Sequence, residues 1–362
     1  MERLLSLDDI GLVPAQLNLG RQEDKYDYSV KDPIDGTMSL PIFTSPMDSI
    51  VNESNWRVWQ DSGIRPVLPR TTDIKVRLEG CEYIFAAFSL KEIQEHFLSF
   101  KRNSSRWFRI CIDSGNGHDI EVFNVSRDLR KIYGNQVNIM VGNIGYPKTY
   151  IDCCNAGVDY VRVGMTTGSL VDEDKYGFYY PMASMLLDIK GLKNTSLTGI
   201  KHAKIIADGG ISNQVEILKA MALGADAVMC GRQFARLVEA AGTMYVRTKT
   251  ASGEEIDEPI SASEVEKMSR SDLKDHKVRR LYVGNTTYEV QARRDGYDDV
   301  HDWTGKKKPC DARSELINVT GKLSSWLDET YDVFSYGFTM AGATKWDDFK
   351  TKINIARIQK WQ

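Results

Sequence analysis

The stretch IIADGGISNQVEILKAMALGADAVMCGR, residues 205–232, decides the fold class. One apolar run ends at Asp208 and is followed by two glycines, a segment of helical period and a second apolar run that ends at Gly231. This pattern is typical of two parallel strands joined by a helix. Because Gly209 and Gly210 let the backbone approach a ligand, the passage also predicts a phosphate site, with Asp208 placed to bind a ribose.

The same alternation of strand and helix extends along most of the chain. Short apolar runs begin near residues 41, 64, 83, 108, 137, 159, 203 and 226, and segments of helical period such as IEVFNVSRDLRKIY, residues 120–133, separate them. Eight such units predict an α/β fold of the (β/α)8 TIM barrel type, in which the carboxyl ends of the strands carry the active site.

The end of the chain departs from this pattern. We expect the barrel at about 38–242, a flap-like excursion at 243–318 and closing helices at 319–362, all within a single domain over 1–362 with no CBS module. Residues 243–318 are polar and heavily charged, which predicts a long mobile flap insertion that covers the site; a disordered or partner-binding arm is the alternative. The segments TGKLSSWLDETYDVFSYGF and TKWDDFKTKINIARIQ predict two helices that close the barrel.

Composition excludes several classes of protein. Hydrophobic residues make up 42% and charged residues 27%, and no apolar run approaches the roughly 18 residues of a membrane span. The start MERLLSLDD is too acidic for a signal peptide, so we expect a cytoplasmic protein. A net charge of −3 gives no reason to expect nucleic acid binding. Six cysteines without CxxC spacing predict neither a disulfide framework nor a zinc site.

Six motifs in order along the chain resemble those of the IMP dehydrogenase and GMP reductase family. They are LLSLDDIGLVP, LPIFTSPMDSIVNE, ICIDSGNGH, VRVGMTTGSL, ADGGI and SYGFTMAGATKWDDF. The resemblance implies an oxidoreductase of purine metabolism that acts on GMP or IMP with NAD(H) or NADP(H) and assembles as a homotetramer. Only about 40 residues separate IRPVLPRT from ICIDSGNGH, too few for the regulatory modules common in the dehydrogenases. This, and the pair Asn116 and Gly117, favours a GMP reductase, which converts GMP to IMP and ammonia with NADPH.

The resemblance also implies roles for individual residues. Ser45 and Met47 would flank the purine, Asp208 would bind the ribose, and Glu315 would assist proton transfer, with Ser314 beside it on the substrate side. The phosphate would be held by Ser169, Gly209, Gly210, Gly231 and Arg232, the last at a position where the family has serine or glycine. The cofactor would be met by Arg70, Asp113, Ser114, Gly115, Asn116, Gly117 and Gly164.

The loop after VRVG departs from the family at the position of the catalytic nucleophile. In the family a cysteine thiolate attacks the purine, and Val171 stands at that position here. Asp172, Glu173 and Asp174 make the loop acidic. The family's potassium site, for which Gly164 and Thr166 would supply ligands, is therefore in question, and no other metal site is predicted.

The missing nucleophile leaves several interpretations of the function open. Cys310, close to three lysines, could supply a thiolate in place of Val171, although other roles fit that residue better. His118 lies near the predicted carboxyl ends of the strands, where a functional histidine could act. We expect it instead to be an exposed loop residue without a role in the site. Alternatives to a GMP reductase are a catalytically inactive nucleotide-binding protein, an enzyme that modifies a different purine nucleotide without a cysteine adduct and, more distantly, a flavin-dependent barrel.

Overall fold

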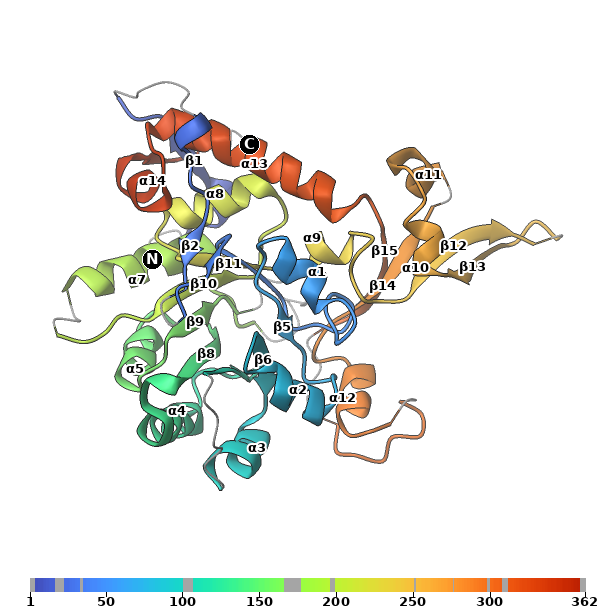
Figure 1. Ribbon diagram of the computed structural model, residues 1–362, viewed down its shortest axis with the longest axis horizontal. Coiled ribbons are helices and arrows are strands. Elements are labelled where there is room, and N and C mark those ends of the chain that lie inside the picture. Colours follow the sequence, from blue (N-terminus) through green and yellow to red (C-terminus); the bar gives the residue numbers. More distant parts are fainter. Residues whose placement is uncertain are drawn as a thin grey trace.

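A computed structural model describes residues 4–16, 23–32, 35–99, 107–165, 177–195, 199–250, 252–275, 277–297, 300–307 and 312–358. Its centre is a parallel eight-stranded sheet, which confirms the predicted barrel (Figure 1). The order in the sheet is β4-β11-β10-β9-β8-β7-β6-β5. The strands are β4 (Ile42–Thr44), β5 (Val67–Leu68), β6 (Phe85–Phe88), β7 (Phe108–Asp113), β8 (Val137–Ile144), β9 (Tyr160–Val163), β10 (Lys204–Asp208) and β11 (Ala227–Cys230).

The two ends of the sheet meet and nearly close the barrel. The Arg65 N–H donates to the Ile42 carbonyl at 2.9 Å, and the Thr44 N–H donates to the Arg65 carbonyl at 3.0 Å. Helices surround the strands (Figure 1). They are α1 (Trp56–Asp61), α2 (Ile74–Gly80), α3 (Leu90–Ile93), α4 (Ile120–Tyr133), α5 (Thr149–Asn155), α7 (Met182–Thr195), α8 (Gln214–Ala222) and α9 (Arg232–Ala235).

Helix α4 illustrates how the sequence sets these elements. The Asp119 side chain accepts a hydrogen bond from the Glu121 N–H at 3.0 Å and caps the first turn. Val122, Val125, Leu129 and Tyr133 recur at helical spacing and are buried. The helix ends at Tyr133, and the next residue, Gly134, has a φ of +53° that favours glycine.

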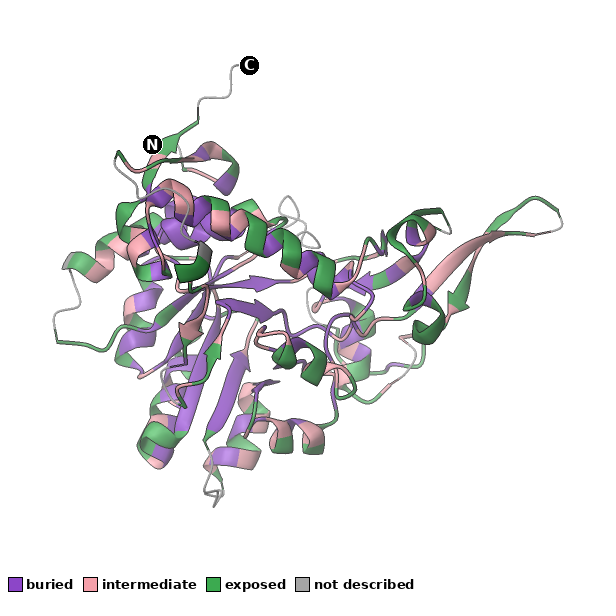
Figure 2. Cartoon of the chain, turned by 45° about the horizontal axis from the view of Figure 1, so that its top comes forward, coloured by how far each residue is buried: buried purple, intermediate pink, exposed green. Residues whose placement is uncertain are grey.

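The interior of the barrel is filled by side chains from all eight strands. Successive residues of a strand face opposite sides, so residues two apart on one strand share the interior. The interior cluster comprises Phe43, Val67, Phe85, Ala87, Cys111, Met140, Tyr160, Ile206, Ala227 and Met229. Two residues further along β7, β9 and β10, the same alternation turns Asp113, Arg162 and Asp208 toward the carboxyl end of the interior. Figure 2 shows the strands buried along most of their length.

The excursion at 243–318 is more regular than the sequence predicted. It forms a four-stranded antiparallel sheet of order β13-β12-β14-β15, and β12 with β13 extends away from the barrel (Figures 1 and 2). Charged pairs lie across the strands, for example Arg247 with Glu255 at 3.2 Å, and explain how so polar a segment makes a sheet. Its elements are β12 (Met244–Lys249), β13 (Glu255–Ile260), α10 (Ala262–Val265), α11 (Arg270–Asp275), β14 (Arg279–Val283), α12 (Tyr288–Arg294) and β15 (Ser314–Asn318).

The prediction for the end of the chain was only partly correct. The first predicted helix is α13 (Leu323–Ala341), but α14 (Trp346–Lys352) ends early because the chain becomes extended at Ile353. The following β16 (Asn354–Arg357) pairs antiparallel with β1 (Ile10–Val13), a partner far away in sequence. Near the start of the barrel, β2 (Val30–Lys31) pairs with β3 (Met38–Ser39). No helix of the described residues is long and apolar enough to cross a bilayer.

Arg280 anchors the excursion to the barrel. Its side chain is fully buried, and its guanidinium donates to the carbonyls of Gly242 at 2.9 Å, Ala235 at 2.9 Å, Val238 at 3.1 Å and Leu237. Burial lowers the pKa of Arg280 to about 10, against the opposing effect of Glu239. A single side chain of β14 therefore organises the turn that follows α9.

Replacing this anchor should be costly. Arg280→Met leaves several buried carbonyls without a donor, so we expect the free energy of unfolding to fall by about 3 kcal/mol or more. Urea denaturation measures the change. Arg270→Met removes an exposed arginine whose ion pair with Glu329 spans 3.1 Å and should change the value by less than about 1 kcal/mol. Equal effects of the two variants would contradict the anchoring role.

Candidate functional site

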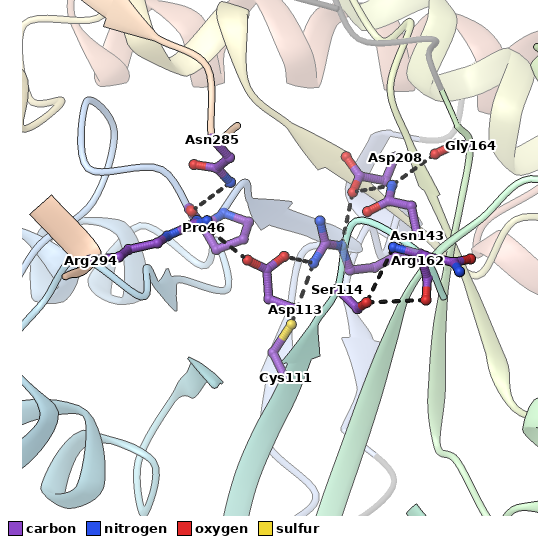
Figure 3. A network of polar contacts seen from close by, with 11 residues as sticks. Pro46, Cys111, Asp113, Ser114, Asn143, Arg162, Gly164, Asp208, Asn285 and Arg294 are labelled. Atoms are coloured by element: carbon purple, nitrogen blue, oxygen red, sulfur yellow. Dashed lines mark hydrogen bonds and ion pairs between the residues drawn. The ribbon is translucent and has the colours of Figure 1, made fainter. Parts of the chain in front are cut away.

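A buried arginine joins two carboxylates at the carboxyl end of the barrel (Figure 3). Arg162 Nη1 lies 2.9 Å from Asp113 Oδ1, and Arg162 Nε lies 2.9 Å from Asp208 Oδ2. The Asn143 side-chain amide donates to the same Asp208 oxygen at 2.9 Å and to the Gly164 carbonyl at 2.9 Å. The ends of β7, β8, β9 and β10 are thus held by one polar network.

The charges of this network stabilise one another. Burial of Asp113 opposes its ionisation, but Arg162, with Arg294 and Arg70, outweighs that effect and lowers the pKa of the carboxyl. Burial likewise opposes the charge of Arg162, yet Asp208 and Asp113 raise the pKa of its guanidinium. Space for the arginine comes from Gly142, where an added Cβ would lie 2.4 Å from the Arg162 Cβ. We did not predict Arg162; its signal is a charged residue within the apolar run YVRV.

A pocket of about 300 Å³ opens above this network. Such a volume is at the lower end of the range for small-molecule sites. Gly209 and Gly210 have φ values of +110° and +72°, so both positions require the freedom of glycine. Ten of the predicted residues line the pocket: Ser45, Met47, Ser114, Gly115, Gly164, Asp208, Gly209, Gly210, Gly231 and Arg232.

The excursion supplies part of the wall. Tyr282, on β14, lies with its hydroxyl 3.6 Å from the Met47 sulfur, and a Cβ added to Gly231 would lie 2.7 Å from the same hydroxyl. The Asn285 side chain donates to the Pro46 carbonyl at 3.1 Å (Figure 3). Gly284 and Thr286 also line the pocket. Sequence reasoning missed these residues, although LYVGN, residues 281–285, carries the same signal as the barrel strands, an apolar run that ends in glycine.

Helix α12 also contacts the barrel rim. Arg293 forms an ion pair with Asp48, directly after Met47. Burial raises the pKa of Asp48, and the charges of Arg293 and Arg294 oppose that rise only in part. The excursion is therefore fastened to the loop after β4 by charge as well as by the Asn285 hydrogen bond.

A second pocket of about 460 Å³ adjoins the first and shares Ser114, Gly115 and Thr286 with it. Four cationic side chains line it, against two carboxylates: Arg70, Lys91, Arg294 and Lys306, with Asp113 and Asp295. Four predicted cofactor residues therefore line this pocket: Arg70, Asp113, Ser114 and Gly115.

The two arginines of this second pocket are incompletely paired. Arg294 Nη2 lies 3.8 Å from Asp113 Oδ2, and Arg70 Nε lies 3.9 Å from Glu92 Oε2. The buried Nε atoms of Arg70 and Arg294 have no hydrogen-bond acceptor among the described residues. Burial lowers the pKa of Arg294 to about 10, and the charge of Arg70 lowers it further while Asp113 opposes the change. Such a site favours an anionic ligand.

Residues 116–118, the second half of the turn after β7, support the rim from outside both pockets. Gly117 donates its N–H to the Asn143 carbonyl at 3.0 Å, and a Cβ there would lie 2.5 Å from that oxygen. His118 is half-buried rather than exposed: its Nε2 accepts from the Gly145 N–H at 2.9 Å, its Nδ1 lies 2.8 Å from Thr149 Oγ1, and burial lowers its pKa. Asn116 and Gly117 do not line either pocket.

The predicted proton-transfer residue has a charged partner. Glu315, on β15, forms an ion pair with Arg232 Nη1, the predicted phosphate ligand. Neither Glu315 nor its neighbour Ser314 lines the pocket. Ser169, Val171, Thr166 and Cys310 lie outside the described residues, so their predicted roles stay predictions.

Comparison with known proteins identifies the family. A family model described as "IMP dehydrogenase / GMP reductase domain" matches residues 108–361. The chain belongs to the IMP dehydrogenase / GMP reductase family.

Known GMP reductases and known inosine-5'-monophosphate dehydrogenases are both similar to this chain. GMP reductases of Streptococcus gordonii and Lysinibacillus sphaericus are each 26% identical, over 76% and 80% of this chain and 83% and 89% of their own lengths. An inosine-5'-monophosphate dehydrogenase of Rhodopirellula baltica is 31% identical over 38% of this chain. The matched region is only a quarter of that dehydrogenase, and about half of the one from Borreliella burgdorferi.

No described cysteine of this family member is placed to attack a ligand. Cys81, Cys111, Cys153, Cys154 and Cys230 are all buried, and none lines the pocket. Burial raises the pKa of Cys111 to about 12, with smaller opposing effects from Arg162, and it raises the pKa of Cys230 as well. Within the described residues no group of three or more His, Cys, Asp or Glu is arranged to hold a metal ion.

The Arg162 network predicts a pH-dependent stability. The pKa of Asp113 is lowered in the folded protein, so its ion pair stabilises the fold above the ordinary aspartate pKa of about 3.9 and is lost as pH falls below it. Arg162→Gln leaves Asp113 and Asp208, each only 12% exposed, without this counter-charge. The free energy of unfolding should therefore fall by about 3–5 kcal/mol at pH 7.

Urea denaturation of wild type and Arg162→Gln from pH 7 down to about pH 2 tests this. The difference between them should shrink as pH falls below about 4, because protonated carboxyls no longer need the guanidinium. A difference that stays constant over this range would show that Arg162 stabilises by packing alone.

Proposed function

We propose that the protein binds a purine nucleoside monophosphate, GMP or IMP, in the pocket above Arg162. The observation that carries the proposal is that Ser45, Met47, Asp208 and Arg232 line one pocket at the carboxyl end of the barrel. These are residues to which the family resemblance assigns the purine, the ribose and the phosphate. The homotetramer, the cytoplasmic location and the potassium site stay predictions.

Each part of the pocket suits one part of such a nucleotide. Gly209, Gly210 and Gly231 expose backbone, and the guanidinium of Arg232 is suited to a phosphate. Asp208 offers a carboxylate to the ribose while Arg162 and Asn143 fix its orientation. Met47 supplies an apolar surface for the purine.

The adjoining pocket is suited to a nicotinamide cofactor. Its four cationic side chains complement the phosphates of a dinucleotide, and the shared Ser114 and Gly115 would bring the reacting end beside the first pocket. When bound, the cofactor would donate or accept a hydride. We therefore propose an oxidoreductase of purine nucleotides, most like a GMP reductase that uses NADPH and releases ammonia.

The test of this activity is direct. Purified protein with GMP and NADPH should oxidise the cofactor and release IMP and ammonia in equal amounts. The absence of turnover with GMP and with IMP, under either cofactor, would reject the proposed activity.

A second candidate is a nucleotide-binding protein without turnover. Val171 at the position of the family's nucleophile favours it, as does the burial of every described cysteine. Calorimetry with GMP and IMP separates the candidates, because tight binding without turnover supports the second and absence of binding defeats both.

A thiol placed at the position of the nucleophile should reveal which step is missing. We expect Val171→Cys to raise the rate of GMP-dependent NADPH oxidation by at least about tenfold, because a covalent adduct divides a difficult displacement into two steps. Val171→Ser has similar size without a thiolate and serves as the control. Equal rates for both variants would mean that the pocket no longer presents the purine to this position.

The second pocket yields a separate prediction for the cofactor. Arg294→Gln removes a buried charge and should weaken NADPH binding by about tenfold, which fluorescence titration measures. Arg57→Gln is the control, because Arg57 stacks on Trp56 and lines neither pocket. If both variants bind NADPH like the wild type, the cationic pocket does not hold the cofactor.

A further inference from the structure

The ion pair between Arg232 and Glu315 connects the barrel to the excursion at the edge of the pocket. Arg232 lines the pocket at the start of α9, whereas Glu315 comes from β15. Their side chains are 30% and 27% exposed, so the pair is accessible to solvent. At this position the resemblance leads us to expect serine or glycine, which could not form such a pair.

The strand register places Glu315 beside the pocket. Glu315 is the direct partner of Tyr282 in the antiparallel pairing of β14 with β15. Side chains of directly opposed residues lie on the same face of such a sheet. Tyr282 lines the pocket, so the face that carries Glu315 is the face that Tyr282 turns toward Gly231 and Met47.

A guanidinium that already holds a carboxylate is less available to a ligand. Arg binds carboxylates and phosphates through the same donors, so the two anions compete for it. We propose that Glu315 is an internal competitor for Arg232, so that a ligand phosphate binds this guanidinium only by displacing the carboxylate. This inference rests on the proposed function and deepens it, because it gives the same site a second state in which the protein itself occupies the phosphate ligand.

The charges of the competing groups decide the exchange. A phosphate monoester carries about −1.5 to −2 charges at pH 7 and three acceptor oxygens, whereas a carboxylate carries one charge and two oxygens. A phosphodiester carries one charge and gains no such advantage over Glu315. Because Glu315 is about a quarter exposed, it can turn into water when displaced, and no lone charge is buried.

Calorimetry with three probes tests the competition: GMP, 3',5'-cyclic GMP and guanosine, against wild type, Glu315→Gln, Arg232→Gln and the double variant. Arg232→Gln should weaken GMP binding by about 10- to 100-fold and leave guanosine unchanged. Glu315→Gln should tighten GMP binding about threefold to tenfold, and cyclic GMP binding by no more than that, because the gain is limited to the free energy of the ion pair that no longer has to be broken.

The double variant distinguishes competition from a structural role. It should bind GMP like Arg232→Gln, because removing the competitor gains nothing once its arginine is gone. Glu329→Gln is the matched control, since Glu329 pairs with Arg270 at 3.1 Å on the exposed surface, and it should change no affinity.

Three results would overturn the inference. If the two substitutions act additively on GMP, or if Glu315→Gln weakens GMP binding, Glu315 does not compete for Arg232, while the proposed function stands. If wild-type protein binds no purine nucleotide, the proposed function fails and the inference fails with it.

Discussion

The site depends on the buried guanidinium of Arg162, because a desolvated charge must be matched by carboxylates at fixed positions. Asp113 and Asp208 provide that match from the ends of β7 and β10, on either side of β9. Asp208 lines the first pocket and Asp113 the second. One arginine therefore holds a residue of each pocket, so a ligand that changes the charge around one carboxylate alters the electrostatics of the other.

The barrel alone does not complete either pocket. Tyr282 and Asn285 of the excursion close the first, and Arg294 and Lys306 close the second. Their position depends on Arg280, whose hydrogen bonds tie β14 to the chain after α9. The excursion thus combines an anchored base, which shapes the site, with a hairpin that extends into solvent (Figure 2).

The sequence predicts the barrel well because strands buried on both faces read as short apolar runs with glycine or aspartate at their ends. The family resemblance named the ten predicted residues that line one pocket. The pattern of apolar runs, however, missed several other parts of the site. It missed Arg162, a single charge inside an apolar strand, because its partners lie 49 and 46 residues away. It also missed β16 and the ion pair of Glu315, since strand register and pairing across the fold leave no local signal.

The residues proposed for binding and the position of the family's nucleophile belong to different elements of this fold, and that separation would explain how the nucleophile can be absent from a chain that has the pocket. The residues proposed to hold the phosphate and ribose follow β10 and β11, and those proposed to flank the purine follow β4, all within the described structure. The nucleophile of the family belongs to the loop after β9, where Val171 stands. On the proposed function, substitution there would remove the covalent step and leave the Arg162 network intact, so affinity for a nucleotide and turnover of it would be separable.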